Sequence, residues 1–185
     1  MSNQTALIIV DIQNDYFTDG LWPLYEPVKA LENVKLLLKK FRDNNETIIH
    51  VQHLANEGAP FFVKGTKGSD IHNDVKPLDN ESVVVKQYAN SFYQTNLLEL
   101  LKSKNIKNIV VTGMMTQNCI DSTVRGASEV GFQYPNITII GDTTATRDLP
   151  VPGGTTISAP LVQQSFLAAL NFAFGKVIST ADYLK

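Results

Sequence analysis

The sequence predicts an α/β fold built around a mainly parallel sheet. Short, continuous apolar runs alternate with longer amphipathic segments along the whole 185-residue chain, and no repeat interrupts the alternation. Continuous apolar runs are typical of strands that are covered on both faces, as in parallel sheets. The length fits one domain, which we expect to span residues 1–185.

Each predicted element has a local signature. Six apolar segments have the composition of buried strands, in chain order residues 6–10, 47–51, 82–86, 109–112, 137–140 and 176–178. Four amphipathic segments between them predict helices, residues 26–44, 95–104, 116–130 and 160–174. Pro27 suits the first turn of the first helix, and Gly131 stands where a left-handed residue ends the third.

Two segments are irregular and rich in Gly and Pro. Residues 54–80 form the first, and at 27 residues it is too long for a routine connection. Residues 141–159 form the second, which also contains several threonines. We expect these two loops to determine specificity for a small-molecule substrate.

Composition excludes several classes of protein. The chain has 16 basic and 18 acidic residues, so it lacks the basic excess of a nucleic-acid binder. The single cysteine, Cys119, excludes an intrachain disulfide and a cysteine zinc cluster. The first apolar run has five residues, far fewer than the roughly 18 that span a membrane. We therefore expect a cytoplasmic protein that binds neither nucleic acid nor membrane.

Chemically useful side chains follow the predicted strands. Right-handed crossovers place the carboxyl ends of parallel strands at one edge of a sheet, and ligands bind along that edge. Asp11 follows the first strand and Lys86 ends the third. Cys119 lies six residues after Gly113, in the first turn of a helix. The sequence thus predicts that an acid, a lysine and the only cysteine meet at this edge.

These three groups suit acyl transfer through a thioester. A helix N-terminus and a nearby ammonium both favour the thiolate of Cys119, and Lys86 would supply that ammonium. Asp11 would accept the thiol proton and pass it to a leaving amine. Each residue alone also has a structural explanation, because a lone cysteine is often a buried apolar residue and strand-end acids often cap turns. Their convergence is what favours catalysis.

Three segments of the chain resemble the isochorismatase-like cysteine hydrolases. The first is residues 6–17, ALIIVDIQNDYF, and the second is Lys86 with the Ser91-Phe92 and Thr95-Asn-Leu97 that follow it. The third and most specific is residues 111–127, VTGMMTQNCIDSTVRGA. The resemblance covers nearly the whole chain. It implies a three-layer α/β/α, Rossmann-like fold with a six-stranded parallel sheet, and a homodimer or homotetramer.

The resemblance also implies roles for individual residues. Asp11, Lys86 and Cys119 would be the catalytic triad. A cis peptide would join Met114 to Met115, and the backbone N–H groups of Met115 and Cys119 would form the oxyanion hole. Two further residues would line the substrate pocket, Tyr16 and Gln52.

The histidines bear on a metal site. Nicotinamidases of this family bind a metal through an Asp-x-His pair after the second strand, whereas this chain has His53 and Ala55 at those positions. The resemblance therefore implies no metal and no cofactor. A site made of His50, His53 and His72 is the alternative, set against histidines that are only hydrogen-bonded or solvated.

The main functional hypothesis is a cysteine-dependent hydrolase that cleaves the C–N bond of a small amide or ureido substrate. One alternative is vinyl-ether hydrolysis of an isochorismate-type acid, in which Asp11 acts as the acid and the cysteine is dispensable. Another is a non-catalytic protein that has kept the fold. The presence of Asp11, Lys86 and Cys119 together favours the first hypothesis.

Overall fold

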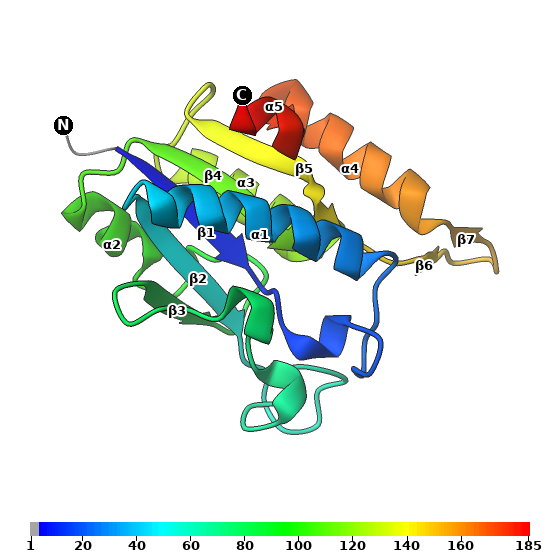
Figure 1. Cartoon of the computed structure of the whole chain (residues 1–185). Coiled ribbons are helices and arrows are strands. Elements are labelled where there is room, and N and C mark those ends of the chain that lie inside the picture. Colours follow the sequence, from blue (N-terminus) through cyan, green and yellow to red (C-terminus); the bar gives the residue numbers. More distant parts are fainter. Residues whose placement is uncertain (1–3) are drawn as a thin grey trace.

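The computed structural model describes residues 4–185, and its centre is a six-stranded parallel sheet (Figure 1). The strand order is β3-β2-β1-β4-β5-β8. The strands are β1 (Thr5–Val10), β2 (Thr47–His53), β3 (Ser82–Lys86), β4 (Asn108–Met114), β5 (Ile137–Ala145) and β8 (Lys176–Ile178). The order places β1 and β4 at the centre, where both faces are covered. The predicted six-stranded parallel sheet is thus confirmed.

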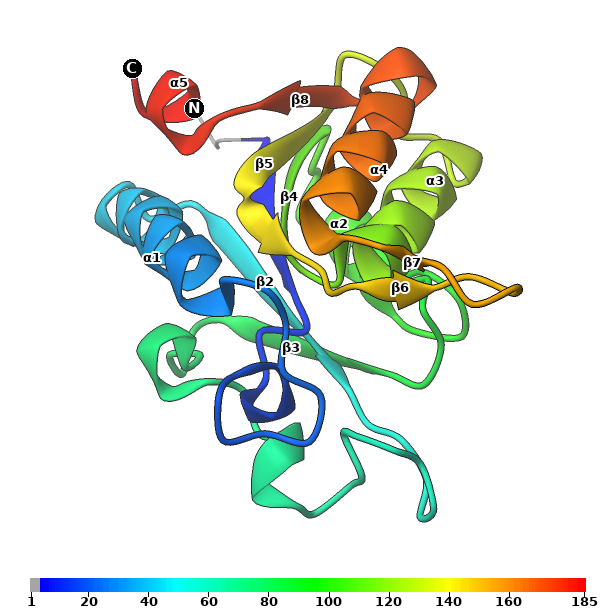
Figure 2. The same ribbon diagram turned by 90° about the vertical axis from the view of Figure 1, so that its right-hand side faces the viewer.

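Helices cover both faces of this sheet. On one face lie α1 (Pro27–Asp43) and α5 (Thr180–Leu184), and on the other α2 (Leu97–Ser103), α3 (Asp121–Glu129) and α4 (Ala159–Ala173) (Figure 2). In β1, Leu7 and Ile9 pack in the core under α1, while Ala6 and Ile8 pack in the core under the other layer. The continuous apolar run therefore fills two cores, and the three-layer prediction is confirmed.

The fold differs from the sequence prediction mainly after residue 140. β5 continues to Ala145, and its pairing with β4 shifts register between Val111 and Gly113. The hydroxyl of Thr143 donates to the Ile140 carbonyl at 2.6 Å, which satisfies a backbone acceptor at the irregularity. The predicted loop 141–159 then contains a small hairpin of β6 (Leu149–Pro150) and β7 (Thr156–Ile157).

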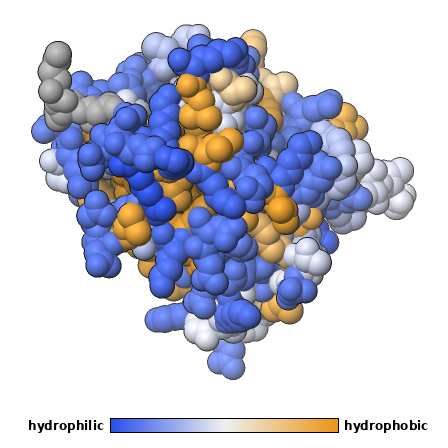
Figure 3. All heavy atoms as spheres, viewed as in Figure 1, coloured by the Kyte–Doolittle hydropathy of each residue, from blue (hydrophilic) through white to orange (hydrophobic). Residues whose placement is uncertain are grey.

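The face of the molecule that carries α1 is mainly hydrophilic, and its apolar side chains form separate patches (Figure 3). Within residues 4–185, none of the helices has the length and hydrophobicity needed to cross a bilayer.

Candidate active site

The carboxyl edge of the sheet begins with Asp11, directly after β1. Its backbone is left-handed, with a φ of 50°, and its N–H donates to the Val51 carbonyl of β2 at 3.0 Å. The neighbouring strand β4 passes very close. Gly113 has a φ of 122°, and a Cβ there would clash with the carbonyl oxygen of Val10. Glycine thus lets the end of β4 lie beside Asp11.

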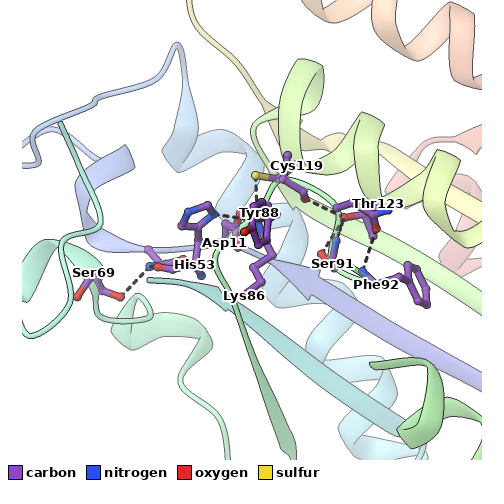
Figure 4. Close-up of polar contacts among 12 residues, drawn as sticks. Asp11, His53, Ser69, Lys86, Tyr88, Ser91, Phe92, Cys119 and Thr123 are labelled. Carbon is purple, nitrogen blue, oxygen red and sulfur yellow. Dashed lines mark hydrogen bonds and ion pairs between the residues drawn. The ribbon is translucent and has the colours of Figure 1, made fainter. Parts of the chain in front are cut away.

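Lys86 contacts both of the residues that it was predicted to meet, Asp11 and Cys119. It ends β3, and its side chain is fully buried. Its Nζ lies 2.8 Å from Asp11 Oδ2 and 3.1 Å from Cys119 Sγ, and it donates to the Tyr88 carbonyl at 3.1 Å (Figure 4). The structure therefore places the carboxylate of Asp11 and the sulfur of Cys119 in direct contact with the ammonium of Lys86.

Cys119 is positioned by the connection between β4 and α3. The peptide bond between Met114 and Met115 is cis, and the π-helical turn Thr116–Ile120 follows and runs directly into α3. The Met115 carbonyl accepts hydrogen bonds from the backbone of Asn118 and Ile120 inside this turn, both at 3.1 Å. The sulfur thus projects from a turn that is fixed at both ends.

The surroundings of Cys119 favour the neutral thiol in the resting site. Burial, and then the nearby Asp11 carboxylate, raise the pKa of Cys119 far above its usual range, and Lys86 opposes them only in part. For Lys86, burial alone would lower the pKa, but Asp11 and Cys119 together raise it by more. The pKa of Lys86 is therefore raised overall, and the ammonium is retained. The sequence analysis considered only influences that lower the thiol pKa. Burial and the closeness of Asp11 lie outside what a sequence shows.

His53 also contacts Lys86 in this site, although the sequence suggested it only as a possible metal ligand. It is the last residue of β2, and it pairs in register with Lys86, the last residue of β3. Its Nδ1 lies 3.1 Å from Lys86 Nζ, the same nitrogen that contacts Asp11 and Cys119 (Figure 4). Burial, and then Lys86, lower the pKa of His53. The signal that could have found it is that His53 and Lys86 both follow apolar runs that pair as neighbours.

The residues around Lys86 do not fit a metal ion. Potential ligand atoms of Asp11, His53 and Cys119 lie within 4.8 Å of one another. The Lys86 ammonium, however, is within 3.1 Å of each of these three side chains. A metal cation bound by all three would face that positive charge at short range, which opposes binding strongly in a buried site.

The three histidines do not converge. His50 contacts Glu81, with His50 Nε2 at 2.8 Å from Glu81 Oε2. His72 lies in the 54–80 loop, where its Nδ1 accepts from the Asp74 N–H at 3.3 Å. Since His53 contacts Lys86, each histidine has a different environment. The structure thus contradicts the three-histidine alternative.

Tyr16 and the long loop cover the site. Tyr16 is buried, and its ring centroid lies 4.5 Å from that of Phe62 in the loop. Burial, and then the charges of Cys119 and Asp11, raise the pKa of Tyr16. Its hydroxyl therefore stays protonated near Asp11 and Cys119, and its role in a substrate pocket stays a prediction.

The loop 54–80 is fixed to its own chain. The buried carboxylate of Asp15 accepts hydrogen bonds from the backbone N–H of Phe62 at 2.7 Å and of Leu21 at 3.1 Å. The predicted pocket residue Gln52 uses its amide N–H to hold the Ser69 carbonyl at 2.8 Å, and buried Gln13 donates to the same carbonyl at 2.7 Å. Gln13 was not singled out from the sequence. At least one amide donor of Gln52 thus holds the loop.

A separate groove of about 510 Å³ lies between the N-terminal ends of α1 and α4. Its lining includes Tyr25, Lys29, Gln163 and Leu167. None of the three residues of the predicted triad lines it. One lining residue contacts the turn that carries Cys119, because the Thr116 hydroxyl donates to Gln163 Oε1 at 2.6 Å.

Known proteins resemble this chain along its length. Residues 5–182 match the model of the isochorismatase domain. An uncharacterized isochorismatase family protein of Bacillus subtilis strain 168, YddQ, is 41% identical over 182 residues, covering 98% of this chain and 99% of YddQ. A maleamate amidohydrolase of Pseudomonas putida is 32% identical over 144 residues, covering 69% of this chain and 67% of that protein.

Solved structures agree with the sequence matches. The crystal structure of an isochorismatase-family hydrolase from Oleispira antarctica superimposes with a TM-score of 0.94 at 37% identity, and it covers 100% of this chain and 97% of its own. The matched region contains the whole sheet and the residues around Lys86. The family model and these relatives show that the chain belongs to the isochorismatase family of hydrolases.

Proposed function

We propose that the protein is a cysteine-dependent hydrolase that cleaves the C–N bond of a small amide or ureido substrate through a thioester. The observation that carries this proposal is the position of Lys86 Nζ, 2.8 Å from the Asp11 carboxylate and 3.1 Å from Cys119 Sγ. Support also comes from the relative named maleamate amidohydrolase, whose name describes amide hydrolysis.

The first half of the reaction releases the amine. Asp11 accepts the proton of the Cys119 thiol as the sulfur attacks the substrate carbonyl carbon, so a C–S bond forms and an oxyanion develops. The backbone N–H groups of Met115 and Cys119 stabilise this oxyanion. Asp11 then returns its proton to the leaving nitrogen as the C–N bond breaks, which leaves a thioester on Cys119.

The second half restores the enzyme. The Asp11 carboxylate, free of its proton again, accepts a proton from water as the water attacks the thioester. Collapse of the intermediate breaks the C–S bond, and the proton on Asp11 returns to the sulfur. Lys86 keeps its proton throughout and balances whichever of Asp11 and Cys119 is negative. Net charge in the buried site therefore stays constant, which avoids the large cost of an unpaired buried charge.

Hydrolysis of a panel of small amides and ureido compounds by the wild type and by Cys119→Ala tests this proposal. We expect the variant to lose at least about a thousandfold in kcat/KM, because an alanine forms no acyl intermediate. Equal hydrolysis by both proteins would contradict the nucleophile assignment. If only a vinyl-ether acid were cleaved, and Cys119→Ala still cleaved it, the alternative reaction would replace this one.

A further inference from the structure

His53 is held rigidly at the end of β2, close to the proposed nucleophile. Its backbone N–H donates to Gln13 Oε1 at 2.8 Å, and its carbonyl accepts from Gln13 Nε2 at 2.9 Å. Gln13 is fully buried, and the next residue is also fixed, because Leu54 N–H donates to the Lys86 carbonyl at 3.0 Å. The backbone that carries the imidazole is therefore fixed, and the ring itself contacts Lys86 Nζ through Nδ1 at 3.1 Å.

The contacts of Lys86 determine which nitrogen of His53 carries the proton. An ammonium has three N–H donors. Four groups surround Nζ, namely Asp11 Oδ2 at 2.8 Å and the Tyr88 carbonyl, His53 Nδ1 and Cys119 Sγ, each at 3.1 Å. A neutral thiol sulfur is the weakest acceptor of the four. Since an ammonium has no acceptor, His53 Nδ1 can make a hydrogen bond with Nζ only by accepting it.

A nitrogen that accepts a hydrogen bond carries no proton of its own. His53 is then neutral, with its proton on Nε2. Within residues 4–185, Nε2 makes no hydrogen bond. The His53 side chain is half-buried, and Nε2 is not among the buried polar atoms that lack a partner. The ring thus offers a fixed N–H donor that the protein itself does not use.

We propose that His53 binds the substrate by donating this Nε2–H to a second oxygen of the substrate, outside the scissile carbonyl. The inference rests on the proposed function and names the substrate class of that site: small amides that carry a further carboxylate or carbonyl oxygen. One ring nitrogen of His53 lies within 4.8 Å of Cys119 Sγ, so the ring that carries Nε2 is close to where an acyl group on the sulfur would lie.

The charges that face His53 support the neutral state. Lys86 is in contact with Nδ1, and a ligand atom of Asp11 and of Cys119 lies within 4.8 Å of a ring nitrogen. Burial and Lys86 together lower the pKa of His53, while Asp11 opposes them. Because Lys86 donates to Nδ1, His53 is a hydrogen-bond donor at Nε2 and does not act as a general base there.

Three variants separate binding of substrate from positioning of Lys86. His53→Asn keeps an acceptor near Lys86 but has no distal donor, His53→Gln carries an N–H₂ group near the position of Nε2, and His53→Ala has neither. With a carboxylate-bearing amide that the wild type hydrolyses, we expect His53→Ala and His53→Asn to raise KM about tenfold or more, with a smaller change in kcat. His53→Gln should recover most of that loss. His72→Gln is the matched control, because His72 lies in the 54–80 loop, where its ring contacts the Asp74 N–H and not Lys86.

Full recovery by His53→Asn would overturn the proposal, since it would mean that the ring only positions Lys86. Equal impairment of His53→Gln and His53→Ala would also overturn it. The same amide with a methyl group in place of the carboxylate should show little difference between the wild type and His53→Ala. A difference as large as that for the acid would contradict the proposed contact.

The tautomer can be measured without any substrate. The chain has three histidines, so ¹⁵N NMR of the wild type, His50→Gln and His72→Gln assigns the His53 ring. We expect a neutral ring protonated at Nε2 from pH 6 to 8, and protonation at Nδ1 would overturn the inference. If Cys119→Ala hydrolyses the panel as fast as the wild type, the proposed function fails, whereas this spectrum still decides the state of His53.

Discussion

One buried charge cluster lies at the carboxyl edge of the sheet and a second lies where α1 meets β2, and only the first contains a thiol. The edge cluster consists of Asp11, His53, Lys86 and Cys119, at the carboxyl ends of the strands. The α1 cluster consists of Arg42 from α1, His50 from β2 and Glu81, which directly precedes β3. Each cluster combines a carboxylate, a basic side chain and a histidine.

The two clusters differ in how much hydrogen-bonding capacity they leave unused. Both oxygens of Glu81 are occupied: Arg42 donates to them at 2.6 and 2.9 Å, and the Leu78 N–H donates at 3.0 Å. In the edge cluster, both oxygens of Asp11 are buried without a hydrogen bond among residues 4–185, and Oδ2 has only its ion pair with Lys86. Since a saturated carboxylate cannot easily accept another proton, the unused capacity of Asp11 distinguishes the edge cluster, which we propose to be catalytic, from the α1 cluster.

Removing the cation from each cluster should give the largest contrast. Lys86→Met leaves Asp11 charged and fully buried, and we expect it to lower the free energy of unfolding by about 3–5 kcal/mol and to abolish hydrolysis. Arg42 is 28% exposed, so Arg42→Met should cost only about 1–2 kcal/mol and retain turnover. Urea unfolding and kcat/KM of both variants give the comparison.

The double variant Asp11→Asn/Lys86→Met is the control for stability. It removes both buried charges, so most of the lost unfolding free energy should return, while hydrolysis stays absent. Wild-type turnover in Lys86→Met would show that Lys86 is not part of the catalytic machinery.

The α1 cluster should control stability in acid. Burial alone would raise the pKa of Glu81, but Arg42, the Leu78 N–H and His50 together lower it from 4.5 to about 2. A depressed folded-state pKa stabilises the protein fully above pH 4.5, and this stability is lost as the pH falls from about 4.5 towards 2. We expect Glu81→Gln to flatten the pH dependence of unfolding in that window by about 2 kcal/mol. An unchanged slope would mean that other carboxylates dominate.

The smallest effect should come from the histidine of the α1 cluster. His50→Gln keeps a polar group near Glu81, so we expect a loss of about 1 kcal/mol of unfolding free energy and a change of less than about twofold in kcat/KM. A tenfold loss of activity would mean that the two clusters are coupled through β2. The comparison with His53→Ala therefore measures how far catalysis is confined to the edge of the sheet.

The sequence was enough to predict the sheet and the meeting of three distant residues. Apolar periodicity marked the six strands, and the rule that ligands bind at the carboxyl edge selected Asp11, Lys86 and Cys119. The extension of β5 to Ala145 was missed because its last residues are polar and Thr-rich, and they pair with β4 only after a register shift.

Other parts of the site depend on details that a sequence does not contain. The predicted second strand ended at residue 51, whereas β2 continues to His53, so His53 was not recognised as the strand partner of Lys86. The direction of an amide side chain is also hidden, and Gln52 uses a donor to hold the loop at Ser69. That Cys119 rests as a neutral thiol could be inferred only once its burial was known, because burial is the largest influence that raises its pKa.

The proposed reaction requires a covalent bond between Cys119 and the acyl part of the substrate. Intact-protein mass spectrometry after rapid acid quenching of the wild type with a hydrolysed amide tests it directly. We expect a mass increase equal to the acyl group, mapped by peptide sequencing to Cys119 and lost in Cys119→Ala. Turnover in which Cys119 is never modified, while Cys119→Ala still forms product, would contradict the account.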